Sequence, residues 1–267
     1  MSTLVQISDT HFGTEQPAVV DAVVALVDSL RPNVVVLSGD ITQRAHREQF
    51  RAAHRFVERL NTARLLTLPG NHDIPLFNVF ARAFRPYANY KECFGSDLEP
   101  YFESDSLLIQ CVNTTRPQRH KDGEVSAGQI ERVSARLQAA KPHQLKIVVT
   151  HQPVHVIRPS DEKNLLHGHQ AAVRAWSRAG ADIVMGGHIH LPYVRPLSDR
   201  LNDLSRRIWS VQAGTAVSHR TRGSIPNSLN VLRYEQRSAG CKVERWDYAA
   251  ASQRFHVVED HTLALDD

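Results

Sequence analysis

Short apolar runs alternate with amphipathic segments along the first two-thirds of the chain. Residues 3–8, 33–39 and 64–70 are aliphatic runs, and the second is typical of a strand buried on both faces. Between these runs, residues 18–30 and 44–60 place apolar side chains at helical spacing. The order strand, helix, strand, helix, strand predicts a parallel sheet with right-handed crossovers.

The apolar positions also indicate which face of each helix is buried. In the first helix they are Val19, Val20, Val23, Leu26, Val27 and Leu30. In the second they are Phe50, Ala53, Val57 and Leu60.

The same alternation continues further along the chain and then changes. We expect further strands at residues 106–113, 145–150 and 182–187, and helices at 126–140 and 170–179. Residues 86–105 and 152–168 contain proline and lack periodicity, which predicts surface loops. The last third predicts sequential strands joined by turns, within residues 206–214, 227–235, 241–248 and 254–258. Together these elements predict one compact domain with two sheets.

Composition places the chain among ordinary globular proteins. It has 267 residues, 42% hydrophobic and 22% charged. The net charge of +4 is too balanced to indicate general nucleic-acid binding, so we expect no stable nucleic-acid complex. The N-terminus lacks the pattern of a signal peptide, and no apolar run has the roughly 20 residues of a transmembrane segment. Cys93, Cys111 and Cys241 are widely spaced, which predicts reduced thiols and a cytoplasmic location.

Polar side chains gather directly after the expected strands. Asp9 and His11 follow the first, Asp40 the second, and the run Asn71-His72-Asp73 the third. His151 follows the strand at 145–150, and His188 and His190 follow the strand at 182–187. Sites in open α/β sheets form at the carboxyl ends of strands. Carboxylate, imidazole and amide ligands without thiolates suit Mn, Fe or Zn and argue against a structural zinc site.

Two His-x-His pairs occur, and only one follows a strand. His188 and His190 come after a Gly-Gly turn and can project together into a site. His167 and His169 stand at the start of an expected helix, where residues two apart diverge by about 200°. We therefore predict that His167 and His169 bind no metal.

The motifs D-x-H (9–11), G-D (39–40), G-N-H-D (70–73), H (151) and G-H-x-H (187–190) stand in an order that resembles the calcineurin-like metallophosphoesterase superfamily. Their spacing is most similar to that of the class III cyclic-nucleotide phosphodiesterases. The resemblance covers roughly residues 3–235, with C-terminal strands at 241–259, so that residues 1–267 form a single metallophosphoesterase domain. It implies an α/β fold of two packed mixed β-sheets flanked by helices in four layers, α-β-β-α.

The resemblance also implies two metal ions and a set of catalytic groups. Asp9, His11, Asp40 and His190 would hold the first ion, and Asp40, Asn71, His151 and His188 the second. A metal-bridging hydroxide would attack the phosphate, His72 would protonate the departing alkoxide, and Asp73 would orient His72.

Substrate contacts are assigned to polar residues in the expected loops. Asn113, Arg116 and Arg220 are the candidates, and for each of the two arginines a solvated basic loop is the slightly favoured alternative. Specificity is expected to depend on residues 86–105, 113–124, 152–168 and 214–227.

The function that these features predict is hydrolysis of a small phosphodiester, with a 3′,5′-cyclic nucleotide as the leading substrate. Another phosphoesterase substrate, such as a phospholipid or glycerophosphodiester, a nucleotide or a phosphoprotein, stays open. A catalytically inactive scaffold is a third alternative, which the complete ligand set disfavours. The resemblance also allows a homodimer.

Overall fold

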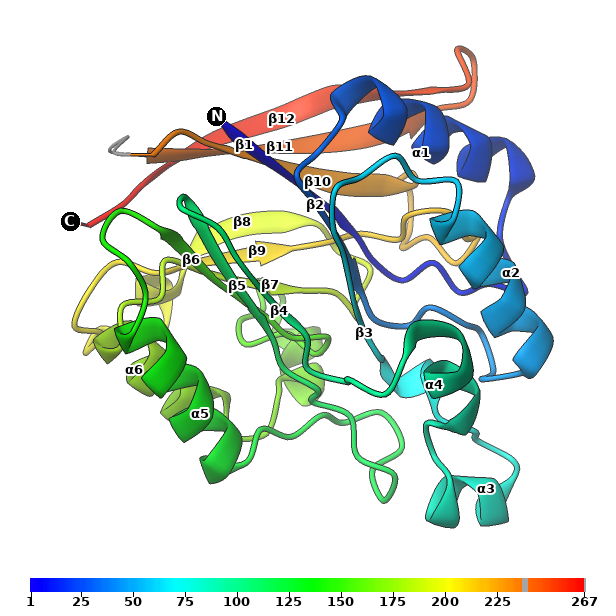
Figure 1. Cartoon of the computed structure of the whole chain (residues 1–267), viewed down its shortest axis with the longest axis horizontal. Helices are drawn as coiled ribbons and strands as arrows, with labels where there is room; N and C mark the ends of the chain where they lie inside the picture. The colour runs from blue at the N-terminus through cyan, green and yellow to red at the C-terminus, as the bar shows by residue number, and fades with distance from the viewer. Residues whose placement is uncertain (237–239, 267) are drawn as a thin grey trace.

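The computed structural model describes residues 1–236 and 240–266, which form two β-sheets with helices on their outer faces (Figure 1). The strands are β1 (Ser2–Ile7), β2 (Val34–Ser38), β3 (Leu65–Leu68), β4 (Tyr101–Glu103), β5 (Leu107–Cys111), β6 (Leu145–Val149), β7 (Ile183–Gly186), β8 (Tyr193–Pro196), β9 (Trp209–Gln212), β10 (Ser228–Tyr234), β11 (Gly240–Ala249) and β12 (Arg254–Ala264). The α-helices are α1 (Pro17–Leu30), α2 (Arg47–Val57), α3 (Val79–Phe84), α4 (Ala88–Phe94), α5 (Ala127–Gln138) and α6 (His169–Arg178). Three short 3-10 helices are η1 (Asn71–Asp73), η2 (Pro159–Asn164) and η3 (Leu197–Asp199).

Each sheet has six strands and mixes parallel with antiparallel pairs. The first has the order β12-β11-β10-β1-β2-β3, in which β1, β2 and β3 run parallel. The second has the order β4-β5-β6-β7-β9-β8, in which β5, β6, β7 and β9 run parallel. The predicted class, two packed mixed sheets flanked by helices, is confirmed.

Three apolar cores separate the four layers. Alternate residues of one strand enter different cores, since Val34 and Val36 pack between the sheets whereas Val35 and Leu37 pack under α1 and α2. On the outer face of the second sheet, Trp176 of α6 is fully buried together with Val133 of α5. Strands buried on both faces explain the continuous apolar runs in the sequence.

The structure differs from the predicted elements at several places. The segment 86–105 is not a loop throughout, because it contains α4 and β4. In α2, Phe56 is buried and Val57 is only partly buried. Of the four late strands, β10, β11 and β12 pair antiparallel in sequence order, but β9 joins the second sheet beside β7.

None of the helices in the described ranges is both long enough and apolar enough to cross a membrane.

Candidate metal centre

The predicted ligands come together where the carboxyl ends of the two sheets meet. Asp9, His11 and Asp40 follow β1 and β2, and Asn71 opens η1 directly after β3. From the second sheet, His151 follows β6, whereas His188 and His190 follow β7. The sequence predicts the strand ends, and the structure shows that two sheets contribute them.

Three groups of residues, which share members, each place their ligand atoms within 4.8 Å of one another. They are Asp9, His11 and His190; His11, Asp40 and His72; and Asp40, His151 and His188. Asp40 belongs to two of them: its Oδ1 is 3.2 Å from His151 Nε2 and its Oδ2 is 3.8 Å from His11 Nε2. A carboxylate in this position can serve two ions at once. Among the described residues, His167 and His169 belong to none of these groups. His167 Nε2 lies 3.8 Å from Asp122 Oδ2, and His169 is the first residue of α6.

The ligands have an unusual backbone conformation. Asp9, His11, Asp40, His188 and His190 have φ between 44° and 72°, although residues with a side chain rarely adopt positive φ. Backbone hydrogen bonds hold this conformation, for example from Asp9 N to the Gly39 carbonyl at 3.1 Å and from His11 N to the Asp40 carbonyl at 2.9 Å. Strained backbone of this kind concentrates at functional sites.

Close contacts between the strand ends require glycine at position 187. A Cβ there would lie 2.1 Å from Ser8 Oγ and 2.5 Å from Asp9 Oδ2. The adjacent His188 N–H donates to both Asp9 carboxylate oxygens, at 3.1 and 3.0 Å. The Gly-Gly turn therefore allows the β7 loop to fix a ligand of the β1 loop.

Electrostatics prepare the cluster for cations. Burial alone would raise the pKa of Asp9, but His190 and His151 lower it to about 2. The pKa of Asp40 is likewise held well below its usual range, because His151 and His72 outweigh burial.

The histidines of the cluster divide into two kinds. Burial lowers the pKa of His11 to about 3 and that of His188 to about 4. For His151, Asp40 outweighs burial and raises the pKa to about 9, and Asp9 raises the pKa of His190 in the same way. Ionised carboxylates and neutral imidazoles are the forms that bind metals, so ion binding would release protons from the last two rings.

Unsatisfied polar atoms test whether these residues fit metal ions. Asn71 Oδ1, His151 Nε2 and His188 Nδ1 are buried and make no hydrogen bond of good geometry, although His151 Nε2 lies 3.2 Å from Asp40 Oδ1. The opposite nitrogen of His151 is 3.0 Å from the Ser38 carbonyl, which orients the ring with Nε2 toward the cluster. Buried unpaired polar atoms are costly, and an ion held by all three would satisfy them. The residues therefore fit two transition-metal ions.

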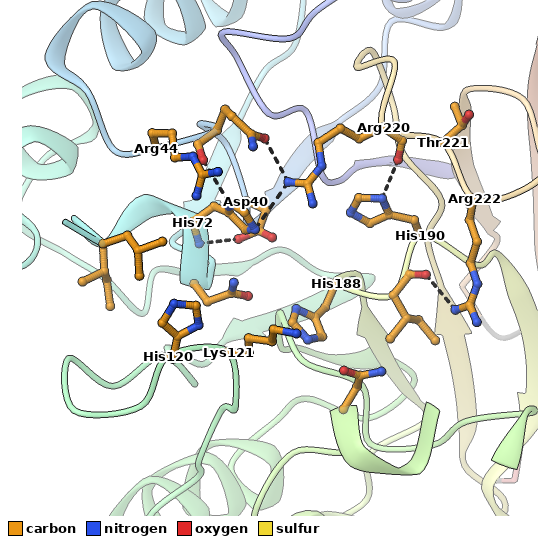
Figure 2. Close-up of a pocket in the computed structure, with 16 residues that line it drawn as sticks. Asp40, Arg44, His72, His120, Lys121, His188, His190, Arg220, Thr221 and Arg222 are labelled. Atoms are coloured by element: carbon orange, nitrogen blue, oxygen red, sulfur yellow. Dashed lines mark hydrogen bonds between the residues drawn. The ribbon is translucent and has the colours of Figure 1, made fainter. Parts of the chain in front are cut away.

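His72 lies beside the ligands, at the edge of a cavity (Figure 2). Its Nδ1 donates to the Gln43 carbonyl at 2.9 Å, and its ring meets that of His11 edge-on at 4.9 Å between centroids. The prediction that Asp73 orients His72 is wrong. The Asp73 carboxylate accepts hydrogen bonds from Ile41 N, Thr42 N, Thr42 Oγ1 and Gly70 N, at 2.8–3.0 Å. Asp73 thus holds two strand-end loops together, and a backbone carbonyl orients His72.

The cavity above the ligands has basic walls and a volume of about 580 Å³. It is lined by Asp40, Gln43, Arg44, Asn71, His72, Ile74, Leu76, His120, Lys121, Asn164, His188, Ile189, His190, Arg220, Thr221 and Arg222. Figure 2 shows the Arg220 guanidinium pointing toward His72, while the Arg220 backbone carbonyl accepts a hydrogen bond from His190 Nδ1 at 2.6 Å. Arg220 Nη1 donates to Gln43 Oε1 at 2.9 Å and lies 3.4 Å from His72 Nε2 and 3.3 Å from His11 Nδ1. Arg220 thus lines the cavity, and its role as a substrate contact stays a prediction.

The other two predicted substrate contacts do not line this cavity. Arg116 donates to the carbonyls of Asn113 and Thr115 and to Gln129 Oε1, at 3.0, 2.9 and 2.6 Å. Asn113 is 8% exposed and bonds to Tyr87 and Thr115. Both residues line a separate depression.

The loops chosen for specificity nevertheless reach the cavity. Loop 113–124 contributes His120 and Lys121 in place of Arg116, and loop 214–227 contributes Thr221 and Arg222 in addition to Arg220. Loop 152–168 contributes Asn164, and segment 86–105 contributes no lining residue among those described. Sequence reasoning missed Gln43, Arg44, His120 and Lys121, which have no motif of their own.

The fold resembles several solved structures at low sequence identity. A purple acid phosphatase from yellow lupin (Lupinus luteus) has a TM-score of 0.75 at 13% identity, over 98% of this chain and 53% of that one. The chain thus spans about half the length of that protein. A dimetal phosphatase from Danio rerio has a TM-score of 0.67 at 14% identity, over 99% of both chains. Vps29 from Chaetomium thermophilum has a TM-score of 0.53 at 9% identity, over 100% of both chains.

The sequence itself supplies the family. No curated protein matches it. Residues 2–192 match the family model described as calcineurin-like phosphoesterase, and the chain therefore belongs to this family of two-metal phosphoesterases.

Proposed function

We propose that this phosphoesterase is a phosphodiesterase that hydrolyses a small phosphodiester, with 3′,5′-cyclic nucleotides as the leading substrate class. The observation that carries the proposal is the meeting of His72 and Arg220 over the metal ligands, in a cavity of about 580 Å³. That volume lies within the range of about 300–1,000 Å³ that small-molecule sites occupy.

Two sets of side chains would hold the ions, with Asp40 shared. They are Asp9, His11, Asp40 and His190 for one ion, and Asp40, Asn71, His151 and His188 for the other. Mn, Fe or Zn bound there would lower the pKa of a bound water, to about 7 in the case of zinc, and would neutralise phosphate oxygens.

Arg220 binds the phosphate. Its described side-chain partners are an amide oxygen and two imidazole nitrogens, which do not neutralise its charge when the rings are neutral. A guanidinium in this state can donate two parallel hydrogen bonds to a phosphate. Arg222 is different, because its Nη2 donates to Asp161 Oδ1 at 2.9 Å.

His72 gives a proton to the departing oxygen. Since Nδ1 donates to the Gln43 carbonyl, the neutral ring presents Nε2 as an acceptor, and Arg220 is positioned to donate to it. A phosphate that accepts the hydrogen bonds of the guanidinium frees Nε2 to receive the proton that the attacking water releases. The alkoxide that leaves from a 3′,5′-cyclic nucleotide needs that proton.

The walls of the cavity suit a compact anionic substrate. Arg44, His120 and Lys121 face it from two loops, with Ile189 and Leu76 as apolar lining (Figure 2). Mixed cationic and apolar walls favour a ligand that has a phosphate and an uncharged ring or alkyl group.

A hydrolysis panel tests the proposal. Cyclic AMP, cyclic GMP, 2′,3′-cyclic nucleotides, a glycerophosphodiester and a phosphomonoester are compared with Mn and with Zn. Preference for the 3′,5′-cyclic nucleotides supports the proposal, whereas hydrolysis of the monoester alone overturns it. Asn71→Ala and His151→Ala should each abolish hydrolysis, and His167→Ala, in the His-x-His pair outside the centre, is the matched control that should retain it.

The remaining assignments are proposals of lower reach. A cytoplasmic location agrees with Cys93, Cys111 and Cys241, which are free. A homodimer is testable by light scattering on the purified chain.

A further inference from the structure

The short helix α3 exposes large apolar side chains next to the metal cavity. Phe77 is 79% exposed, Val79 74%, Phe80 77% and Phe84 71%. We call these four residues the apolar patch. The Phe80 and Phe84 rings lie 4.7 Å apart between centroids, so the patch is contiguous there. Figure 1 shows α3 at the lower corner of the molecule, projecting away from both sheets.

Arg82 fixes the orientation of α3. Its guanidinium donates to the carbonyls of Pro75, Pro117 and Arg119, at 3.1, 2.6 and 2.7 Å. The helix has no buried residue. It therefore turns its arginine toward the protein and its apolar residues toward solvent, which is the reverse of an ordinary surface helix. Contiguous exposed apolar surface of this kind marks an interaction site.

The chain around the patch is basic. Residues 74–91 contain no Asp or Glu, and besides the inward-turned Arg82 they include Arg85 and Lys91. In the neighbouring loop Lys121 adds a further positive charge, whereas Arg119 is paired with Glu124 at 2.7 Å and Arg116 lies in a separate depression. If two copies met through this surface, like charges would face each other, which argues against a symmetric dimer here. Aromatic side chains with a basic rim are complementary to an anionic lipid surface.

The patch is continuous with the cavity. The Arg44 guanidinium stands 5.4 Å from the centroid of the Phe77 ring, and Arg44 also lines the cavity. Leu76, next to Phe77, lines it too. A surface that contacts the patch therefore lies beside the mouth of the cavity.

We propose that the apolar patch and its basic rim dock on an anionic lipid bilayer, with the cavity mouth next to the interface. The phenylalanines enter the headgroup layer, while the cations of the rim, Arg85, Lys91 and Lys121, contact lipid phosphates. Docking needs neither metal nor hydrolysis, so the proposal goes beyond the phosphodiesterase assignment and does not depend on it.

Vesicle co-sedimentation tests docking without any substrate. The chain should bind vesicles of phosphatidylcholine with phosphatidylglycerol, should bind pure phosphatidylcholine more weakly, and should lose affinity as salt rises. Phe80→Ser with Phe84→Ser should weaken binding by about tenfold or more, because both rings lose their apolar transfer. Arg85→Glu should weaken binding to the anionic vesicles alone.

The matched control changes two exposed valines elsewhere. Val257 and Val258 are 46% and 54% exposed on β12, at the opposite side of the view in Figure 1. Val257→Ser with Val258→Ser should bind vesicles as the wild type does. Circular dichroism and hydrolysis of a soluble phosphodiester check folding, since neither Phe80 nor Phe84 lines the cavity.

Three outcomes overturn the proposal. The wild type fails to bind anionic vesicles; the double phenylalanine variant binds as well as the wild type; or that variant abolishes a concentration-dependent self-association while vesicle binding stays unchanged. The last result would make the patch an interface between two copies of the chain.

Discussion

Substitution of Gly187 by alanine should separate metal binding from folding. The added methyl group would stand 2.1 Å from Ser8 Oγ and 2.5 Å from Asp9 Oδ2, whereas ordinary contacts begin near 3.4 Å. The carboxylate therefore has to move by about 1 Å, and neither Ser8 nor Asp9 has any exposure to solvent that would let it move freely. Metal–ligand distances tolerate only about 0.2 Å. Asp9 should lose its position as a ligand.

The cost to stability is smaller than the cost to the metal site. One extra methyl group in a packed interior destabilises by about 1–3 kcal/mol. In a domain of this size, that lowers the melting temperature by about 2–10 °C. Displacing a group that positions a ligand weakens metal binding by about 10- to 100-fold, and loss of the ligand itself should cost at least as much.

The assay is metal content after dialysis against Mn, measured by mass spectrometry alongside the melting temperature. Gly128→Ala is the control: its methyl group would meet nothing closer than Arg132 Nη1 at 3.6 Å, and in helix α5 it should stabilise by about 0.4–1 kcal/mol. Ser8→Ala in the Gly187→Ala background removes the closer clash but leaves the one with Asp9. Stability should recover only in part, because the 2.7 Å hydrogen bond from Ser8 Oγ to Asp9 Oδ2 is lost too, and metal binding should not recover. Two ions bound by Gly187→Ala with wild-type affinity would refute this reasoning.

Three further changes probe the charge arrangement. Arg220→Ala should lower kcat/KM by about 10- to 100-fold at unchanged metal content, because hydrogen bonds to charged groups contribute about 1.5–3 kcal/mol; wild-type kinetics would contradict the phosphate contact. Removal of metal by a chelator should lower the melting temperature by about 5–10 °C, since an ion at 100 times its dissociation constant stabilises by about 2.7 kcal/mol, and Mn should restore it. Arg206→Met should destabilise by about 2–4 kcal/mol in urea unfolding, because it leaves the Asp182 carboxylate, whose side chain is 5% exposed, without its 2.7 Å partner. Burial already raises the pKa of Asp182 and loss of Arg206 raises it further, so the deficit should shrink as falling pH protonates the carboxyl; a deficit independent of pH would contradict this origin.

The clustering of the candidate ligands was predictable because its signals are local. Asp9 and His11 are two residues apart after an apolar run, and His188 with His190 repeats that pattern after Gly187. Such spacings identify strand ends without any knowledge of the tertiary fold. The positive φ values of five ligands were not predictable, because hydrogen bonds between neighbouring strand-end loops impose them.

The predictions for Asp73 and Asn113 differ from the structure because the groups that decide their roles have no signature in the sequence. The Gln43 carbonyl orients His72, and because every residue has a backbone carbonyl, the sequence cannot indicate which one does so. The carboxylate of the neighbouring Asp73 was therefore predicted to orient the ring. Asn113 was expected at the cavity because it follows β5, but its N–H donates to Glu99 Oε1 at 3.1 Å and its carbonyl accepts from Gln129 Nε2 at 2.8 Å. These contacts draw the start of the loop under α5, and only His120 and Lys121 return to the cavity.

The segment after the third strand shows the same limit for surfaces. Periodicity can identify the apolar face of a helix, but it does not show whether that face packs against the protein. The orientation also depends on which hydrogen-bond partners the polar face has in the folded chain. In α3 the polar face finds three carbonyls, two of them in a loop 35 and 37 residues further on. These hydrogen bonds replace the water that the Arg82 guanidinium would otherwise bind, and they leave Phe80 and Phe84 exposed to solvent. The orientation of α3, and with it the surface that we propose for lipid docking, is thus a product of tertiary structure.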